Sequence, residues 1–436
     1  MRLTTCAFAR TVGRVAALLA CLSLGAEVLH GAVASPGGEI LTKQWTIPLA
    51  GTWRFALDPN DLGVKQRWFA RKLVDTVRLP GTTDENHKGI FKDEQCVDRL
   101  SRIWYWKGPA WYQREVTVPD SWAGKHITLL LERSKNTRVW IDETFCGWED
   151  TLSAPQVFDV SKAMTPGWHT ITVLVDNARL PPVGPSHAVD ERTQTNWNGI
   201  IGRMELQATD PIWLQDVQIY PNAARKQAVV RVTVGNISDR PAAGQVTVRC
   251  MSYNVAEPAA FATQSIDVRA SERQTVIEFT YRPGDDVPLW DEFQPALLRL
   301  DLALEATADG KSYHDQQSIK FGLRDFTRDR NQLKITGRDV FLRGRIDCCF
   351  YPLTGYPPMD KAAGSRCCRS SRTGASTTSV FIPGARPRRR SKRPTNWGCI
   401  SRRSCRTSAA RSTPRKTKRQ LITTSTGWMS KAPKPK

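Results

Sequence analysis

The sequence predicts a mostly β protein that contains two consecutive β-sandwiches. Hydrophobic and polar residues alternate in short runs, most clearly at 171–175, 230–234 and 300–304. Such a period of two is typical of half-buried strands, because successive side chains of a strand point to opposite faces. Turn-forming residues separate the runs, for example at 165–167 and 283–285. No amphipathic pattern of helical period is longer than about a dozen residues, so many short strands with regular turns favour sandwiches.

Tryptophan content divides the strand-rich region into two blocks. The first block, residues 40–210, holds 11 of the 15 tryptophans. We expect most of them to fill the core of a sandwich and a few to be available for stacking on sugars. The second block, residues 211–325, has only Trp213 and Trp290 and has roughly the size of an immunoglobulin domain. Residues 326–360 form a third block that begins as a hairpin followed by a buried strand.

The positive charge of the chain is confined to its last part. All 42 acidic residues lie at or before Asp360, and residues 361–436 carry the whole formal charge of +21. The sequence predicts that residues 361–436 are a disordered, basic low-complexity tail. Arginines with Trp397 and Trp428 can in principle hold phosphates and stack on bases. Because the rest of the chain is net neutral, we expect no evolved nucleic-acid partner.

The N-terminus has the features of an export signal, and we assign residues 1–34 to a signal peptide. Arginines precede an apolar run from Val15 to Gly25, which is too short to span a bilayer, and small residues follow at 32–34. The sequence therefore predicts a periplasmic or extracellular protein. Lipoprotein anchoring at Cys21 is the alternative. No other segment is apolar enough for a membrane span.

The cysteines between the signal and the tail indicate neither a disulfide framework nor a zinc site. Their spacing is irregular and contains no CxxC pair. We expect scattered core cysteines, and the sequence predicts neither a metal site nor a cofactor. The residues concerned are Cys96, Cys146, Cys250, Cys348 and Cys349.

Eight segments, in one order along the chain, resemble those of a known enzyme family. They are Gly51–Phe55, Pro80–Thr82, Ala110–Pro119, Thr137–Asp142 with Gly147, Asn196–Gly202, Asp216–Tyr220, Leu289–Trp290 with Phe321–Arg324, and Phe341–Gly344. The family is glycoside hydrolase family 2, the β-galactosidase and β-glucuronidase group. This resemblance implies that residues 40–210 are a galactose-binding-like jelly roll and residues 211–325 an immunoglobulin-like sandwich. It also implies that residues 326–360 hold the first strand region of an incomplete (β/α)8 barrel.

The resemblance implies a retaining β-glycosidase, which hydrolyses O-glycosyl bonds with two glutamates roughly 5 Å apart. In the family the acid/base glutamate follows an asparagine, and both glutamates lie beyond the first barrel strand. No Asn-Glu dipeptide occurs in this chain, and no acidic residue follows Asp360. We therefore assign no catalytic residue and predict that the chain is inactive. A non-catalytic carbohydrate-binding module is the alternative, although such a module has no reason to carry a barrel strand.

A reading frameshift shortly after Asp360 would explain the abrupt change in composition. Synonymous codons for Phe381–Pro387, Ser391–Gly398 and Met429–Lys436 can be read one nucleotide earlier to give segments that resemble the early barrel. We expect the barrel to be truncated in this way. The DNA after codon 360 tests the hypothesis.

A polar loop that ends near residue 198 is the best candidate for a sugar contact, because the family lends loops of the jelly roll to the rim of its active site. Hydroxyl-binding side chains around one aromatic ring suit a sugar. The alternative is a structural loop held by hydrogen bonds. The predicted substrate-binding residues are Asp190, Glu191, Asn196, Trp197 and Asn198. A second polar loop, Asp84–His87, is a weaker candidate, and the partner in either case is a carbohydrate.

Overall fold

The computed structural model describes residues 45–92, 102–152, 154–181, 196–342, 344–347, 351, 354–366, 378–381 and 400–402. The predicted signal peptide, the candidate residues Asp190 and Glu191, and most of the basic tail lie outside these ranges. Most of the described elements are strands, so the prediction of a mostly β fold is confirmed. None of the helices in the described ranges is long and apolar enough to cross a membrane.

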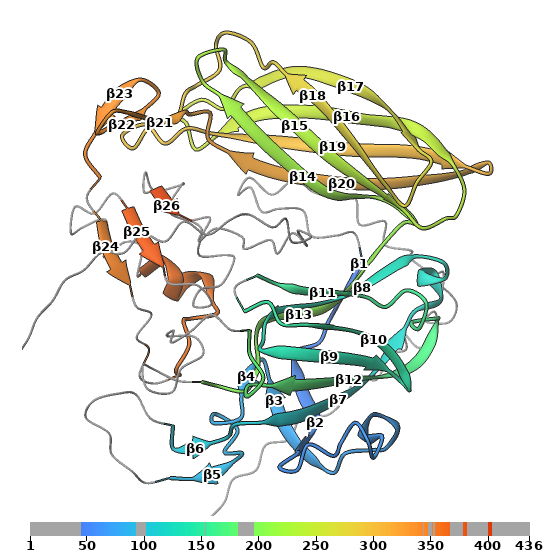
Figure 1. Ribbon diagram of the computed structural model, residues 1–436. Coiled ribbons are helices and arrows are strands. Elements are labelled where there is room, and N and C mark those ends of the chain that lie inside the picture. The colour runs from blue at the N-terminus through green and yellow to red at the C-terminus, as the bar shows by residue number, and fades with distance from the viewer. Residues whose placement is uncertain are drawn as a thin grey trace, which may run out of the picture. The chain divides into compact units, whose positions relative to one another are not determined.

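The first sandwich consists of two antiparallel sheets (Figure 1). The five-stranded sheet contains β1 (Trp45–Pro48), β13 (Gly199–Thr209), β8 (His126–Arg133) and β11 (Gln156–Asp159), with β4 (Gly81–Thr82) paired to β13. The six-stranded sheet has the order β10 (Thr144–Glu149), β9 (Asn136–Ile141), β12 (Gly167–Asp176), β7 (Pro109–Val118), β2 (Gly51–Leu57) and β3 (Asp75–Leu79). A short ribbon of β5 (Ile90–Phe91) and β6 (Trp104–Tyr105) and two 3-10 turns, Trp68–Ala70 and Asp120–Trp122, complete this region.

The core of this sandwich follows from the alternation in the sequence. Ile171, Val173 and Val175 of β12 point inward and are completely buried. Trp53 and Trp122 also lie in this core, as expected for tryptophans of the first block. Other tryptophans lie on the outer face of the six-stranded sheet instead, and some of these are exposed to solvent. The tryptophans of the inner face therefore contact the sandwich core, whereas some of those on the outer face contact solvent.

The second sandwich is smaller and its core is mainly aliphatic, with valines and leucines from both sheets. One sheet has the order β14 (Ile212–Asn222), β15 (Gln227–Asn236), β18 (Gln274–Tyr281), and the other β17 (Ala260–Ala270), β16 (Ala242–Tyr253), β19 (Leu297–Ala308), β20 (Lys311–Phe321). Cys250 is buried here with a free thiol, and Cys146 of the first sandwich is also free, as the scattered-cysteine prediction expects.

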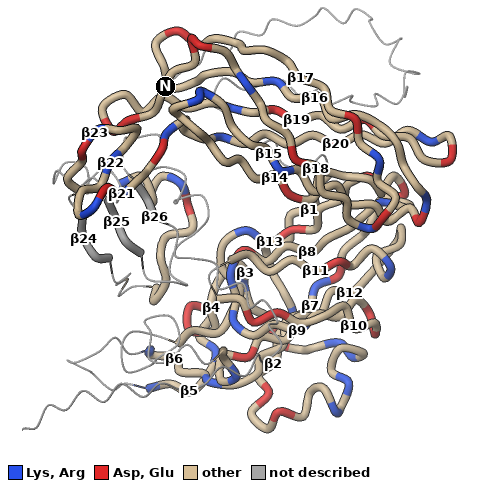
Figure 2. Tube along the Cα trace, turned by 45° about the horizontal axis from the view of Figure 1, so that its top comes forward, with Lys and Arg blue, Asp and Glu red and all other residues tan. Residues whose placement is uncertain are grey.

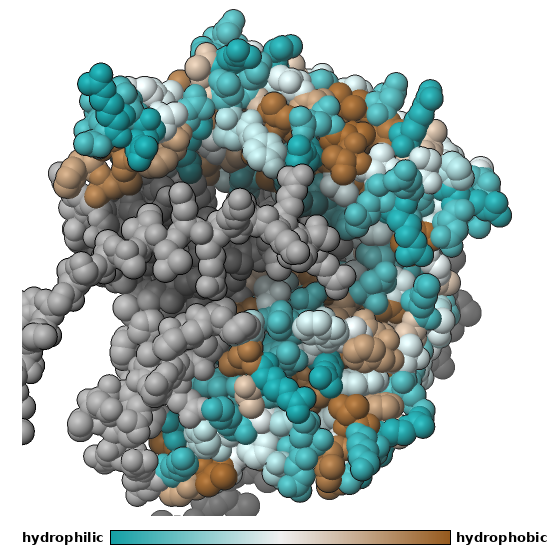
Figure 3. Space-filling model, viewed as in Figure 1, coloured by the Kyte–Doolittle hydropathy of each residue, from teal (hydrophilic) through white to brown (hydrophobic). Residues whose placement is uncertain are grey.

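Both sandwiches carry charges of either sign. Figure 2 shows acidic and basic residues interspersed along the strands, which fits the net neutrality of residues 1–360. In the space-filling view of Figure 3, a hydrophobic patch interrupts the hydrophilic surface of the second sandwich.

A hairpin and three parallel strands follow the second sandwich. The antiparallel strands are β21 (Phe326–Asp329), β22 (Gln332–Ile335) and β23 (Arg338–Val340), and the parallel strands are β24 (Gly344–Asp347), β25 (Thr378–Phe381) and β26 (Ile400–Arg402). A helical turn covers 361–366 between the first two parallel strands. Parallel pairing needs a crossover of a dozen or more residues, which these spacings provide. The structure describes only this turn and the strands β25 and β26 within residues 361–436, so the disordered tail stays a prediction.

Candidate functional site

Asn198, one of the predicted sugar-binding residues, is completely buried at the start of β13. Its Nδ2 donates to the carbonyl oxygens of Gly108 at 2.9 Å and Val175 at 3.0 Å. Its Oδ1 accepts the Tyr112 hydroxyl at 2.8 Å. A buried amide without such partners would cost about 1–3 kcal/mol. The contacts of Asn198 thus stabilise the junction of three strands, which is the role that the structural-loop alternative describes.

Asn196 lies in the same network and is 5% exposed. Its Nδ2 donates to the carbonyl oxygen of Asn177 at 2.7 Å, and the Asn177 Nδ2 donates to the carbonyl oxygens of Asn196 and Trp106, both at 3.0 Å. The Asn196 Oδ1 is buried and accepts no hydrogen bond from a described residue. A sugar contact by either asparagine stays a prediction, as it does for Asp190 and Glu191 outside the described ranges.

Trp197, which lies between these asparagines in the sequence, packs against the segment that follows β24. Its ring centre lies 6.2 Å from that of Tyr356 in an edge-on arrangement, and Ile201 and Met359 complete the cluster. The Lys135 ammonium lies 4.3 Å from the centre of the Trp197 ring on another side. Trp197 is 5% exposed, so little of its ring surface is available to a ligand.

The second candidate loop, Asp84–His87, is also held by hydrogen bonds and an ion pair to other parts of the protein. The Glu85 carboxylate accepts the Tyr356 hydroxyl at 2.8 and 2.9 Å and the Thr82 backbone N–H at 3.0 Å. The Asp84 carboxylate accepts the Trp104 N–H at 2.8 Å and pairs with Arg102 at 3.2 Å. Both loops therefore contact Tyr356. We call Asp84, Glu85, Lys135, Trp197 and Tyr356 together the rim cluster.

Three basic side chains are buried beside the rim cluster, namely Arg102, Arg133 and Lys135. Burial, together with the charges of Arg102 and Arg133, lowers the pKa of Lys135 to about 7. Desolvation penalises the charged form of a lysine, and neighbouring cations add to that penalty. Arg102, Arg133 and Lys135 therefore lie close enough together at this edge of the first sandwich for the two arginines to disfavour the charge of the lysine.

The sequence interpretation missed the basic side chains and Tyr356. A signal was present, because a strand whose residues are all buried ends in Arg133 and is followed directly by Ser134 and Lys135. A polar run that continues a buried strand indicates groups with special partners. For Tyr356, which meets Glu85 from 271 positions away, no local pattern could have indicated the contact.

The rim cluster is a packed and hydrogen-bonded contact between the two loops and Tyr356. The described residues include no group of three or more histidines, cysteines, aspartates or glutamates placed to hold a metal ion. The carboxylates of Glu85 and Asp84 already accept hydrogen bonds from Tyr356 and Arg102. Ligand binding at the rim cluster stays a prediction.

Comparison with known proteins points to one enzyme family. Residues 47–209 match the family described as glycosyl hydrolases family 2, sugar binding domain. Among curated proteins, a β-glucuronidase of Paenibacillus borealis is 22% identical over 314 residues, covering 68% of this chain and 48% of that protein. A β-galactosidase of Oenococcus oeni is 20% identical over 331 residues, covering 72% of this chain and 31% of that protein.

Solved structures share the fold. The β-glucuronidase 2 of Bacteroides uniformis superposes with a TM-score of 0.66 at 18% identity, covering 82% of this chain and 42% of that one. A putative β-galactosidase from Bacteroides fragilis gives a TM-score of 0.64 at 18% identity, covering 82% and 52%. The chain spans about half or less of the length of the curated relatives given above. The family match over residues 47–209, the curated relatives and the shared fold together support a member of glycoside hydrolase family 2.

Proposed function

We propose that this chain is a carbohydrate-binding, non-catalytic form of a family 2 retaining β-glycosidase. The observation that carries the proposal is the distribution of carboxylates in the full sequence. Retention at a β-glycoside requires two carboxyl groups about 5 Å apart. The chain has no Asn-Glu dipeptide and no acidic residue after Asp360. As written it can bind a sugar but has no carboxylate pair to cleave one.

We further propose that the intact parent hydrolyses O-glycosyl bonds outside the cytoplasm, after export directed by residues 1–34. The relatives named above are a β-glucuronidase and a β-galactosidase, so a β-linked sugar is the substrate class. A slip of one nucleotide after codon 360 accounts for the loss of the glutamates. The gene would then encode the remainder of a barrel in the neighbouring frame.

A freestanding carbohydrate-binding module is the second candidate, and the self-contained core of the first sandwich favours it. The packing of Tyr356 and Met359 on Trp197 and Ile201 favours the glycosidase origin instead. A module that works alone has no need for a segment after β24 that covers one of its tryptophans. We therefore place the module second.

The test is hydrolysis of a panel of 4-nitrophenyl β-glycosides by the purified full chain. We expect no turnover above the buffer rate for β-galactoside, β-glucuronide, β-mannoside or β-glucoside. The matched positive control is the protein expressed from the same gene with one nucleotide inserted or removed after codon 360, which should gain activity. Turnover that co-purifies with the unaltered chain would contradict its inactivity. A neighbouring frame without an open barrel sequence would remove the frameshift and leave the binding proposal standing.

A further inference from the structure

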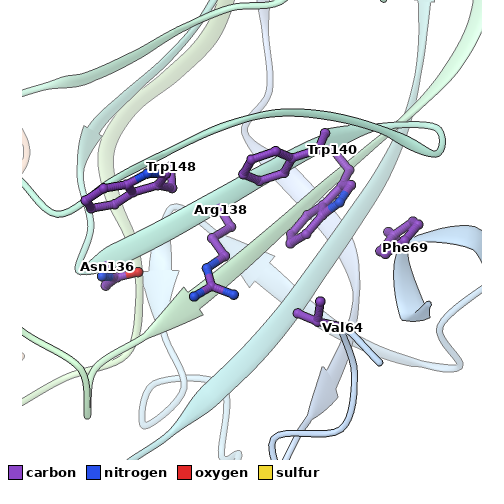
Figure 4. A pocket seen from close by; sticks show the side chains of 7 residues that line it. Val64, Phe69, Asn136, Arg138, Trp140 and Trp148 are labelled. Atoms are coloured by element: carbon purple, nitrogen blue, oxygen red, sulfur yellow. The ribbon is translucent and has the colours of Figure 1, made fainter. Parts of the chain in front are cut away.

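A groove runs over the outer face of the six-stranded sheet, on the side opposite the sandwich core. Its volume is about 550 Å³, and the residues that matter for its chemistry are Phe69, Asn136, Arg138, Trp140, Phe145 and Trp148. Figure 4 shows Arg138 between Trp148 and Trp140, with Phe69 beyond Trp140. None of these residues belongs to the rim cluster, so the groove is a separate feature of the first sandwich.

A β-bulge places the two exposed aromatic residues on one face. In β9, Val139 and Ile141 point into the core, so that Arg138 and Trp140 point outward. In β10, Phe145 lies opposite Trp140 and Trp148 opposite Arg138, because the register shifts between residues 145 and 147. Regular alternation would put Phe145 and Trp148 on opposite faces, and the extra residue of a bulge corrects this.

The floor of the groove is rigid. Trp140 is only 5% exposed and stacks on Phe69 with ring centres 5.2 Å apart and on Trp111 at 5.3 Å. The loop that carries Phe69 is held by Asp58, whose carboxylate accepts the Trp111 indole N–H at 3.1 Å and the Gly63 N–H at 2.7 Å. A preformed floor lowers the cost of ordering the site when a ligand binds.

The upper part of the groove is open and its polar groups are unused. Phe145 is 52% exposed and Trp148 is 59% exposed. Within the described ranges, the Arg138 guanidinium and the Asn136 amide make no side-chain hydrogen bond or ion pair. Arg54, on the same sheet, is by contrast paired with Glu115 at 2.9 Å. Two aromatic faces therefore lie beside one cation and one amide that are free to bind.

We propose that this groove is a carbohydrate-binding site that holds a pyranose unit of a glycan. A pyranose has an apolar face of C–H groups, which suits the ring face of Trp148 or Phe145, and a rim of hydroxyls. The planar guanidinium of Arg138 can donate to two neighbouring oxygens at once, and the amide of Asn136 can donate and accept. Aromatic walls with a few converging polar groups are typical of small-ligand sites.

The charge of the groove argues against nucleic acid as the ligand. Single strands stack on aromatic residues in much the same way, but their backbone requires several cations that follow the phosphates. Here Arg138 is the unpaired cation among the groove residues, and Arg67 at the edge is paired with Glu143. A sugar, which carries at most one charge per unit, matches this arrangement better.

This site rests on the proposed function only in taking the ligand to be a carbohydrate. It needs neither the barrel nor the rim cluster. It would add a contact with a glycan that is separate from the rim cluster.

The test uses the full chain in native gels that contain soluble xylan, glucuronoxylan, mixed-linkage β-glucan or galactan. We expect at least one glycan to retard the chain, and Trp148→Ala and Arg138→Met each to weaken that binding about tenfold. The matched control is Trp168→Ala, because Trp168 is 76% exposed on the neighbouring β12 but does not line the groove. It should bind as the unaltered chain does, and circular dichroism checks that all variants fold.

Two results would overturn the site, and they differ in what else they affect. If Trp148→Ala and Arg138→Met are retarded as strongly as the unaltered chain, the sugar binds elsewhere and the proposed function survives. If no glycan retards the unaltered chain, carbohydrate binding fails together with the groove. Hydrolysis of nitrophenyl glycosides is a separate measurement, and its result does not depend on whether the groove binds a glycan.

Discussion

Two tryptophans of the first sandwich, Trp197 in the rim cluster and Trp148 in the groove, differ in how far other side chains cover their rings. Each has a basic side chain beside it, Lys135 at 4.3 Å in the first case and the strand partner Arg138 in the second. Trp197 is 5% exposed and packs under Tyr356, whereas Trp148 is 59% exposed. Residue type is therefore a poor guide to function here. Coverage of the ring by other side chains separates a structural tryptophan from one that can bind.

The strongest test of this comparison is to truncate both tryptophans. Trp197→Ala should lower the free energy of unfolding by about 3–5 kcal/mol, because it empties a packed cluster. Trp148→Ala should change it by less than about 0.5 kcal/mol, as is usual for an exposed side chain. Urea unfolding followed by circular dichroism measures both. Equal losses for the two variants would mean that the groove tryptophan is structural as well.

A second, smaller effect is expected at Asn198. The Asn198→Ala variant leaves the carbonyls of Gly108 and Val175 and the hydroxyl of Tyr112 without their buried partner. We expect a loss of about 2 kcal/mol in unfolding free energy, with unchanged retention in glycan gels for the folded fraction. Asn136→Ala, which removes an amide without a described partner, is the control and should have little effect on stability. Weaker glycan binding by Asn198→Ala with unchanged stability would make Asn198 a sugar ligand instead.

The smallest effect depends on pH and concerns Lys135. Its pKa of about 7 lies below the ordinary value of 10.5, so between these values the folded state binds fewer protons than the unfolded state. Stability should therefore rise with pH across this window, and the cost of burying the charge is fully present below about pH 7. Lys135→Met removes that cost. The variant should gain about 1 kcal/mol or more relative to the unaltered chain at pH 6, since one pKa unit corresponds to about 1.4 kcal/mol.

At pH 10 the gain of Lys135→Met should have largely disappeared. Chemical unfolding at both pH values measures the difference. Lys162→Met is the control, since Lys162 is an exposed lysine of the same domain. A gain of equal size at pH 6 and pH 10 would show that Lys135 is destabilising for reasons of packing and not of charge.

The alternation of residues was sufficient to predict much of the fold. Residues 171–175 alternate because their strand has one face in the core, and the structure places Ile171, Val173 and Val175 there. The candidate loop was only partly predictable. A polar composition attracts attention at Asn196 and Asn198, but the same composition serves hydrogen bonds to the backbone. Whether an amide faces a strand or a ligand depends on neighbours that are distant in the chain.

The groove was not predictable from local pattern. Its aromatic pair depends on a register shift at Cys146, which turns Trp148 to the same face as Phe145. Its floor depends on Phe69, which reaches Trp140 from 71 positions away in the sequence. Neither feature can be recognised from the hydrophobic periodicity of the sequence, because a bulge interrupts the period of a strand and a loop has no period.

The sequence alone predicted the mostly β fold and the order of the family segments, and it showed that no acidic residue follows Asp360. These properties are local or compositional, since periodicity, motifs and charge are read directly along the chain. Tertiary structure decided which tryptophans are covered, that Lys135 is buried beside two arginines, and that Arg138 has a ring on either side. These depend on pairing between strands and on contacts across the chain, because exposure and electrostatic environment are set by neighbours in space.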